Sequence, residues 1–267
     1  MKKSLLLFVF CLFQINVNAQ ETIGILGAFP PELVHLRANL VNAKDTVIRS
    51  ARFITGQLRG KNVVLAQTGV GKVNAAITTT LMLEHFNPTQ LIFSGIAGAV
   101  DPALRPGDIV IGTDITYHDF GAVKDDAMEY WATKNPLTNL ANPVTFKCDP
   151  ALVAKATEVS KGLTFQQIQR KSGNRMPAVK QGVIVTGDVF VSSKKITDRL
   201  IKDLKAAATE MEGAAVAQTC YQQNVPFLII RSMSDNANEH AKDDMGNFYD
   251  IAATNAATLV MAVVGGN

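Results

Sequence analysis

The stretch PFLIIRSMSD at residues 226–235 decides the fold class, because it has the pattern of a buried strand that ends in polar side chains. Its run of Phe227, Leu228, Ile229 and Ile230 shows no alternation with polar residues. Such a run is typical of a sheet that is covered on both faces. Comparable short runs alternate with helical patterns along the chain, and this alternation predicts a single α/β domain.

The expected elements are bounded by turn residues and by changes in hydrophobic period. Strands are predicted at residues 22–27, 62–67, 90–94, 108–115, 182–186, 209–211 and 226–232. Helices are predicted at residues 31–40, 73–85, 151–161, 213–222 and 248–264.

Polar or glycine-rich groups follow several of these strands, at residues 27–32, 68–72, 94–98, 186–188, 210–213 and 231–235. Open α/β sheets bind ligands at the carboxyl ends of their strands, so we expect the functional site there. Pro30 and Pro31 suit the start of a helix, because the first-turn N–H groups lack intrahelical partners. Glu32 is therefore expected in the first turn of a helix, at the end of the first strand.

Two glycine-rich groups resemble cofactor motifs but lack their spacing. Around Gly71-Lys72, a phosphate-binding loop would need a glycine at Ala66 and a Ser or Thr at Val73. The group at residues 94–98 lacks the three-glycine dinucleotide pattern. The four histidines show no metal-ligand spacing, so we expect neither a cofactor nor a metal.

Three acids from distant parts of the chain are expected at the same edge of the sheet. Glu210-Met211-Glu212 ends a strand with two carboxylates, and burying them is costly unless they are paired or functional. We expect Glu212 to turn into a cleft because Gly213 ends the strand, and Asp235 and Glu32 to join it. The alternative is three unrelated acids in loops or helix caps.

Six motifs occur in order along the chain, at residues 23–28 with Glu32, and at 69–73, 94–98, 186–191, 210–213 and 231–237. In these motifs the chain resembles the bacterial 5′-methylthioadenosine/S-adenosylhomocysteine nucleosidases, within the wider family of purine nucleoside phosphorylases and uridine phosphorylase. The resemblance implies a twisted mixed sheet surrounded by helices, a homodimer, no cofactor, and hydrolysis of adenosine-type nucleosides.

The resemblance also implies a role for each matching residue. Asp235 would protonate the leaving purine, Glu212 would hold the ribose hydroxyls, and Glu32 would activate water near Arg231. The remaining substrate-binding candidates are Phe190, which would stack on the purine, the Val191 backbone, Met211 against the ribose, and Ala97, Gly98 and Ser234.

The 5′ end of the substrate would lie in an apolar pocket that the partner subunit helps to close. The candidates are Phe29, Met245, Phe248 and the aromatic segment at residues 117–131, and the alternative is that these residues are plain core or dimer contacts. Ile96 stands where a small hydroxyl residue often occurs in the family, and Pro30 and Pro31 replace a polar or acidic pair.

The required chemistry explains these residue types. Breaking an N-glycosidic bond develops positive charge on the sugar and negative charge on the purine, so a proton donor and nearby anions stabilise the transition state. Asp235 should then keep its proton, whereas Glu32 should stay ionised beside Arg231. The competing functions are a phosphate-dependent nucleoside phosphorylase and a nucleoside-binding storage protein without turnover.

The first nineteen residues have the pattern of a cleaved secretory signal. A basic start at Lys2-Lys3 precedes an apolar run and a small-residue exit at Ala19. The catalytic domain is therefore expected at residues 20–267, in the periplasm or secreted, with no membrane association after cleavage. Removing Lys2 and Lys3 and no acid lowers the formal charge from +3 to +1, so no nucleic-acid partner is indicated. Cys148 and Cys220 would remain, and two cysteines are too few for a disulfide framework. The sequence leaves undecided whether these two form a single disulfide.

We predict that a bacterial host exports the full chain and cleaves it near Ala19. Mass spectrometry of the protein from the periplasm or medium should give an N-terminus at or near Gln20. An intact Met1 on protein confined to the cytoplasm would contradict this.

Overall fold

Three parallel strands form the centre of the molecule. The computed structural model describes residues 21–125, 127–168 and 174–266. In it, β5 (Gln90–Ala99) lies between β1 (Thr22–Gly27) and β12 (Phe227–Asp235) and is parallel to both. All three are almost entirely buried, as their continuous apolar sequences predict.

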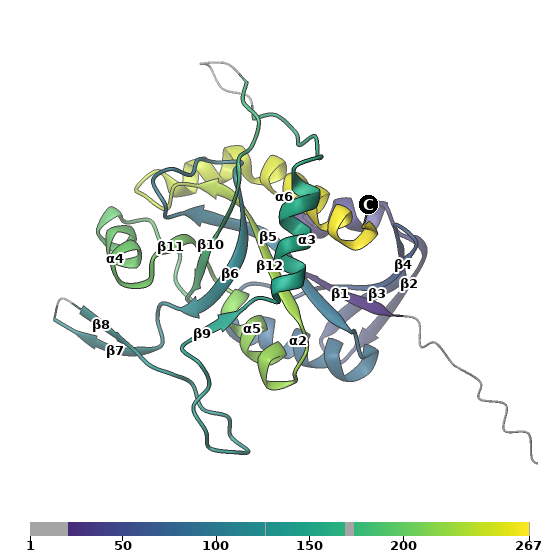
Figure 1. Ribbon diagram of the computed structural model, residues 1–267, viewed down its shortest axis with the longest axis horizontal. Helices are drawn as coiled ribbons and strands as arrows, with labels where there is room; N and C mark the ends of the chain where they lie inside the picture. Colours follow the sequence, from purple (N-terminus) through teal and green to yellow (C-terminus); the bar gives the residue numbers. More distant parts are fainter. Residues whose placement is uncertain (1–20, 126, 169–173, 267) are drawn as a thin grey trace, which may run out of the picture.

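The sheet is mixed, and part of it closes into a ring. Its order is β11-β10-β6-β12-β5-β1-β4-β3-β2, and β11 also pairs antiparallel with β5. The other strands are β2 (Val41–Ile48), β3 (Ala51–Leu58), β4 (Lys61–Gln67), β6 (Ile109–Tyr117), β9 (Thr145–Lys147), β10 (Val179–Thr186) and β11 (Ala206–Glu210). A separate hairpin of β7 (Gly121–Lys124) and β8 (Ala127–Tyr130) projects from one side of the molecule (Figure 1).

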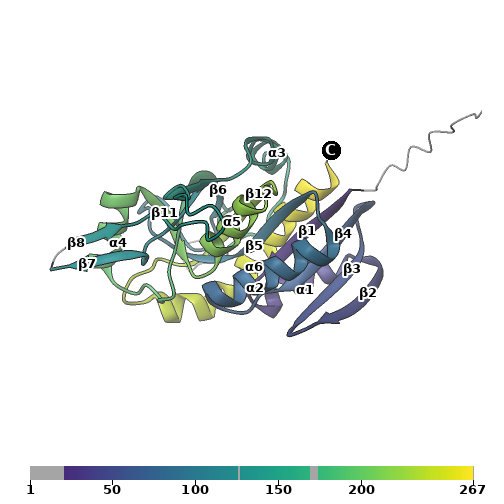
Figure 2. The same ribbon diagram turned by 90° about the horizontal axis from the view of Figure 1, so that it is seen from below.

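Helices cover both faces of the sheet (Figures 1 and 2). On one face α1 (Pro30–Ala38), α3 (Pro150–Ser160) and α6 (Ala241–Gly265) pack together, and on the other α2 (Lys72–Phe86) packs against α5 (Gly213–Gln222). The last helix, α4 (Lys194–Leu204), lies on β10 and β11. The chain therefore has the expected α/β architecture, a mixed sheet surrounded by helices.

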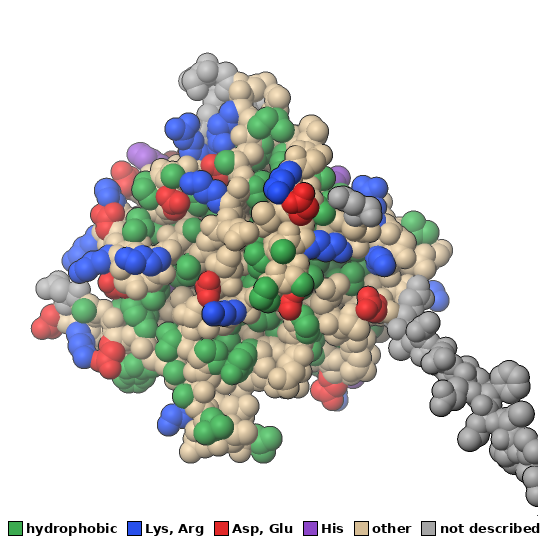
Figure 3. Space-filling model, viewed as in Figure 1, with side chains coloured by type: hydrophobic (Ala, Val, Ile, Leu, Met, Phe, Trp, Pro, Cys, Tyr) green, Lys and Arg blue, Asp and Glu red, His purple; other side chains and the backbone are tan. Residues whose placement is uncertain are grey.

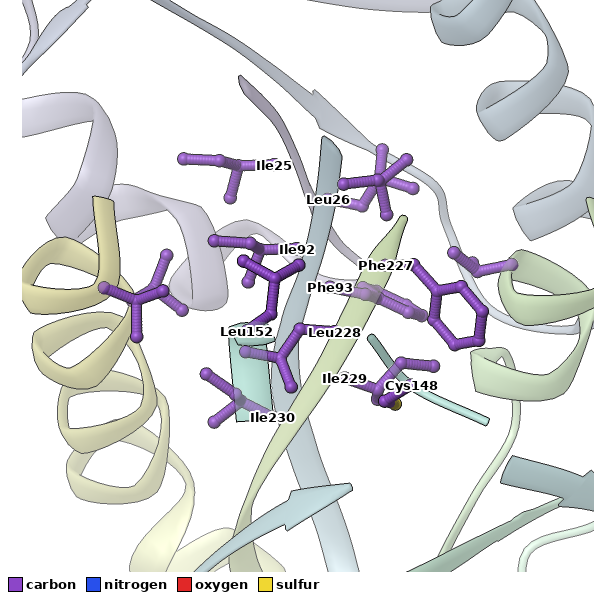
Figure 4. Packing of buried hydrophobic residues seen from close by; sticks show 14 of the residues in the cluster. Ile25, Leu26, Ile92, Phe93, Cys148, Leu152, Phe227, Leu228, Ile229 and Ile230 are labelled. Atoms are coloured by element: carbon purple, nitrogen blue, oxygen red, sulfur yellow. The ribbon is translucent and has the colours of Figure 1, made fainter. Parts of the chain in front are cut away.

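Alternation along β12 supplies the core on both faces. Leu228 and Ile230 point toward α6, whereas Phe227 and Ile229 point toward the opposite face (Figure 4). Helix α6 is long and apolar enough to cross a bilayer by length and composition, but 56% of its most apolar window is buried inside the protein. It is therefore packed as a core helix.

The predicted strands and helices all occur, but several ends were placed wrongly. β5 and β12 continue to Ala99 and Asp235 because they keep pairing with each other and β5 with β11, so Gly95 and Gly98 lie within a strand. The helix predicted at residues 248–264 begins at Ala241, with Asp243 and Asp244 in its first turn. The elements β2, β3, β7, β8, β9 and α4 were not predicted. The proposed signal at residues 1–19 lies outside the described residues.

Candidate active site

A cleft of about 150 Å³ opens at the carboxyl ends of β5 and β12. It gathers side chains from almost every element that ends at this edge of the sheet. The lining residues are Phe29, Glu32, Val70, Ile96, Ala97, Gly98, Phe190, Thr209, Glu210, Met211, Glu212, Ser234, Asp235 and Met245. The three acids that the sequence predicted to meet do meet here.

Asp235 ends β12 at an irregularity in the strand. The pairing of β12 with β5 shifts between Met233 and Asp235, which brings the Asp235 carboxyl next to Gly98. Its Oδ1 accepts a hydrogen bond from the Ala237 N–H at 2.7 Å, and its Oδ2 lies 2.8 Å from the Ser234 hydroxyl. Burial raises the pKa of Asp235, and these two donors only partly oppose the rise. This environment favours a carboxyl group that keeps its proton.

Glu212 lies between the end of β11 and the start of α5, and it faces the cleft as expected. Its Oε1 accepts a hydrogen bond from the Gly71 N–H at 2.8 Å. Burial, and then the neighbouring Glu210 carboxylate, raise the pKa of Glu212 to about 8, while the Gly71 N–H and Arg231 oppose the rise. A carboxyl group with this pKa is mostly protonated at neutral pH.

Glu32 lies in the first turn of α1, where the prolines place it. Its Oε2 accepts hydrogen bonds from the N–H groups of Ala28 and Phe29, and its Oε1 accepts one from Ile96 at 3.1 Å. Burial nevertheless raises the pKa of Glu32, although Arg231 and the three N–H groups oppose the rise. Arg231 thus acts on Glu32 in the expected direction, but burial has the larger effect on its pKa. A raised pKa suits a general base, which works best when its pKa lies near the operating pH.

Arg231 is buried beneath the cleft and forms its ion pair with Glu210. The Nη2 to Oε2 distance is 2.7 Å, and the two side chains are 1% and 3% exposed. Arg231 is still close to Glu32, because a Cβ built on Gly95 would lie 2.9 Å from Glu32 Oε1 and 3.1 Å from Arg231 Nη1. The predicted neighbourhood of Glu32 and Arg231 is thus present, but Glu210 is the partner that holds the guanidinium.

Most of the predicted substrate-binding residues line the cleft: Phe29, Ala97, Gly98, Phe190, Met211 and Ser234. Val191 is buried and lines a neighbouring hollow of about 360 Å³ beneath the β7–β8 hairpin. Phe248 is not among the lining residues; Met245, on the preceding turn of α6, is. The aromatic segment at residues 117–131 does not line the cleft of its own chain.

Sequence reasoning missed the role of Glu210. Besides pairing with Arg231, its carboxylate accepts hydrogen bonds from the N–H groups of Glu212 and Gly213 and from the Thr186 hydroxyl. The available signal was Arg231 itself, because an arginine within a buried strand requires an acidic partner.

The residues that the structure describes contain no group of three or more His, Cys, Asp or Glu side chains arranged to hold a metal ion. They do contain two cations near the cleft, Arg231 and Lys72. Both are paired with carboxylates, Arg231 with Glu210 and Lys72 with Asp119 and Asp188. Cys148 and Cys220 are buried free thiols.

The chain belongs to the phosphorylase superfamily, whose family model matches residues 22–265. Within it, the chain is 38% identical over 243 residues to the 5′-methylthioadenosine/S-adenosylhomocysteine nucleosidase of Psychromonas ingrahamii, covering 91% of this chain and 97% of that protein. It is 36% identical to the nucleosidase of the same name from Mycobacterium bovis, covering 90% and 95%.

The solved structures include the Neisseria meningitidis nucleosidase of this name in complex with methylthio-immucillin-A. That structure matches with a TM-score of 0.78 and 35% identity, over 92% of this chain and 99% of that chain. The family resemblance seen in the sequence motifs, and the fold that it implied, are thereby confirmed.

The raised pKa of Glu212 predicts how stability depends on pH. Between its ordinary pKa of 4.5 and its folded pKa of about 8, the folded protein keeps a proton that the unfolded chain has released. Wild-type stability therefore falls as pH rises through this window and levels off above it. Glu212→Gln removes the titration, so its melting temperature relative to wild type should increase by roughly 10 °C from the acidic to the alkaline end.

Differential scanning fluorimetry across this window measures the effect. The matched control is Glu158→Gln, at an exposed carboxylate that is 69% accessible, which should run parallel to wild type. Parallel curves for Glu212→Gln and wild type would show that folding does not raise the pKa of Glu212.

Proposed function

We propose that this protein hydrolyses the N-glycosidic bond of adenosine-type nucleosides and releases adenine and the free ribose derivative. Its family membership and its similarity to proteins named as nucleosidases support this. So does the convergence of Glu32, Glu212 and Asp235 with Phe190 and Met211 in one cleft. The candidate substrates are 5′-methylthioadenosine, S-adenosylhomocysteine and 5′-deoxyadenosine.

The charged groups in and near the cleft favour water over phosphate as the nucleophile. Four carboxylates line it, from Glu32, Glu210, Glu212 and Asp235, and no Lys or Arg is among the described lining residues. The two nearby cations, Arg231 and Lys72, are already paired with carboxylates. A phosphate dianion needs free cations and free N–H donors. Here both nearby cations are paired, and three nearby backbone N–H groups already donate to Glu32, so water is the favoured nucleophile.

We assign the acid's role to Asp235. Its protonated carboxyl would donate to the purine as the glycosidic bond breaks, which neutralises the negative charge that develops on the leaving base. Burial supports this role because it raises the pKa of Asp235 and so favours the protonated form. Phe190, half exposed at the cleft mouth, would stack on the purine ring and orient it.

We assign ribose binding to Glu212 and activation of the attacking water to Glu32. Glu212 would accept hydrogen bonds from the ribose hydroxyls, with Met211 against the ribose. Glu32 would take a proton from the attacking water, and its three backbone N–H donors fix its orientation. A storage protein without turnover would not need three buried acids with raised pKa values in one cleft, so their presence favours an enzyme.

We also propose a homodimer in which the partner subunit closes the 5′ side of the cleft. Exposed apolar side chains occur on α2, on α5 and on the segment between β8 and β9; they are Val73, Ile77, Leu137, Leu140, Val144 and Tyr221. Figure 3 shows hydrophobic side chains gathered over this lower part of the molecule. Val73 is close in sequence to Val70, which lines the cleft, so a partner seated here would reach the cleft edge.

Export remains part of the proposal. The family match begins at residue 22, after the basic and apolar leader pattern. An exported enzyme would act on nucleosides outside the cytoplasm, although S-adenosylhomocysteine and 5′-methylthioadenosine arise inside cells.

The first functional prediction is adenine release from 5′-methylthioadenosine in phosphate-free buffer. Chromatography of the products should show adenine and 5-methylthioribose, with a rate that does not increase when phosphate is added. Strict dependence on phosphate, with a ribose 1-phosphate product, would identify a phosphorylase. Nucleoside binding without any product would identify a storage protein.

The second functional prediction tests Asp235 as the acid. Asp235→Asn should lower kcat for adenine nucleosides by about 10²–10⁴, because an amide donates a hydrogen bond but has no acidic proton to transfer. The loss should be much smaller for a nitrophenyl riboside, whose leaving group departs without protonation. Steady-state kinetics of wild type and variant on both substrates measure this, and equal losses on both would show that Asp235 only positions the substrate.

A further inference from the structure

An ion cluster lies next to the cleft, outside the three acids that face the substrate. The Lys72 Nζ lies 2.8 and 2.7 Å from the two carboxylate oxygens of Asp119 and 3.7 Å from Asp188 Oδ2. The same ammonium lies over the Tyr117 ring, 5.5 Å from its centre. Lys72 and Asp119 are each 22% exposed, so water screens this pair less than it screens surface pairs.

The cluster joins three segments that are distant in the sequence. Lys72 begins α2, Asp119 follows β6, and Asp188 follows β10. The Asp188 N–H donates to Asp119 at 2.8 Å, and Asp188 Oδ1 accepts from the Lys72 N–H at 2.8 Å. Asp188 is two residues from Phe190, so the same cluster anchors the segment that carries the aromatic ring of the cleft.

The first N–H groups of α2 are used by carboxylates of this chain. Gly71 donates to Glu212 and Lys72 donates to Asp188. Gly71 has a φ of +94°, which favours glycine, and a Cβ there would lie 3.2 Å from Asp188 Oδ1. A helix N-terminus that would otherwise attract an external anion is thus occupied by the protein's own acids.

Apolar packing contributes little to holding this loop. Val70 and Val73, on either side of Gly71, are exposed. The position of the Gly71 N–H therefore depends on the contacts of Lys72 and Asp188. Among the described residues, the Gly71 N–H is the one backbone group that donates a hydrogen bond to the Glu212 carboxylate.

We propose that Lys72, Asp119 and Asp188 are positioning residues for the nucleosidase reaction, which hold the Gly71 N–H against Glu212 and the Phe190 segment over the cleft. This inference rests on the proposed function for its kinetic consequence. Its structural consequence, an ordered loop at residues 69–72, does not require turnover.

Loss of the cluster should change the titration of Glu212. The groups that face this carboxyl are Glu210 and Glu32, which raise its pKa, and Arg231 and the Gly71 N–H, which lower it. Lys72→Met keeps the aliphatic stem but leaves Asp119 and Asp188 to repel each other. The Gly71 N–H should then move away, and the acidic limb of kcat/KM should shift up by roughly one pH unit.

The experiment compares Lys72→Met and Asp119→Asn with Lys72→Arg as the conservative rescue. The matched control is Lys194→Met, because Lys194 pairs with Asp198 at the same 2.7 Å on an exposed surface. Both disruptive variants should lose roughly 10- to 100-fold in kcat/KM at neutral pH, show the shifted limb, and exchange the amides of Gly71 and Lys72 faster by hydrogen–deuterium exchange mass spectrometry. Lys72→Arg should recover most of the rate, and Lys194→Met should match wild type.

Wild-type exchange and an unchanged pH profile in Lys72→Met would overturn the proposal. So would a loss that Lys194→Met shares, because that would indicate a general effect of removing a surface ion pair. If Lys72→Met fails to fold, Asp119→Asn and Lys72→Arg carry the same comparison. Exchange needs no substrate, so a wild-type protein that hydrolyses nothing would refute the proposed function and leave the exchange result to decide the positioning role.

Discussion

The buried ion pair between Arg231 and Glu210 is the interaction on which the site depends. Two charges that are almost fully removed from water cost several kcal/mol each unless geometry and additional hydrogen bonds compensate. Here Glu210 also accepts from the first N–H groups of α5, and Arg231 donates to the carbonyls of Phe93 and Ile230 while its guanidinium stacks on the Phe93 ring. The pair thus ties the end of β11 to the middle of β12 and to Phe93 of β5, and the cleft lies at the carboxyl ends of these strands.

This pair also sets the electrostatics above it. Four carboxylates surround one small cleft, and a single guanidinium lies directly beneath them. Gly95 lets the charge act at short range, because any side chain on this residue would separate Glu32 from Arg231. Gly95 therefore allows close packing within β5 and also keeps the guanidinium of Arg231 near Glu32, the proposed general base. Because Glu210 holds this guanidinium, the described lining of the cleft offers a phosphate nucleophile no unpaired cation.

The sequence predicts what depends on local pattern. Buried strands such as β12, the proline start of α1 and the turn at Gly213 were found, and with them Glu32, Glu212 and Asp235. It could not show that β5 continues through Gly95 and Gly98, because that depends on pairing with β11 and β12. Nor could it assign Arg231 to Glu210 rather than Glu32, or join Lys72 to Asp119, since these contacts connect residues far apart in the chain.

The three acids differ in ways that let one site assign them different tasks. Asp235 accepts from two neutral donors, and burial raises its pKa, which favours the protonated form. Glu32 has three N–H donors and a nearby guanidinium, which support its charge. Burial and the neighbouring Glu210 carboxylate raise the pKa of Glu212 to about 8, so its protonated form predominates at neutral pH. Two ribose hydroxyls donating to Glu212 would favour its ionised form, and positive charge developing on the sugar would favour it further. The substrate itself would thus create the anion that stabilises its own transition state.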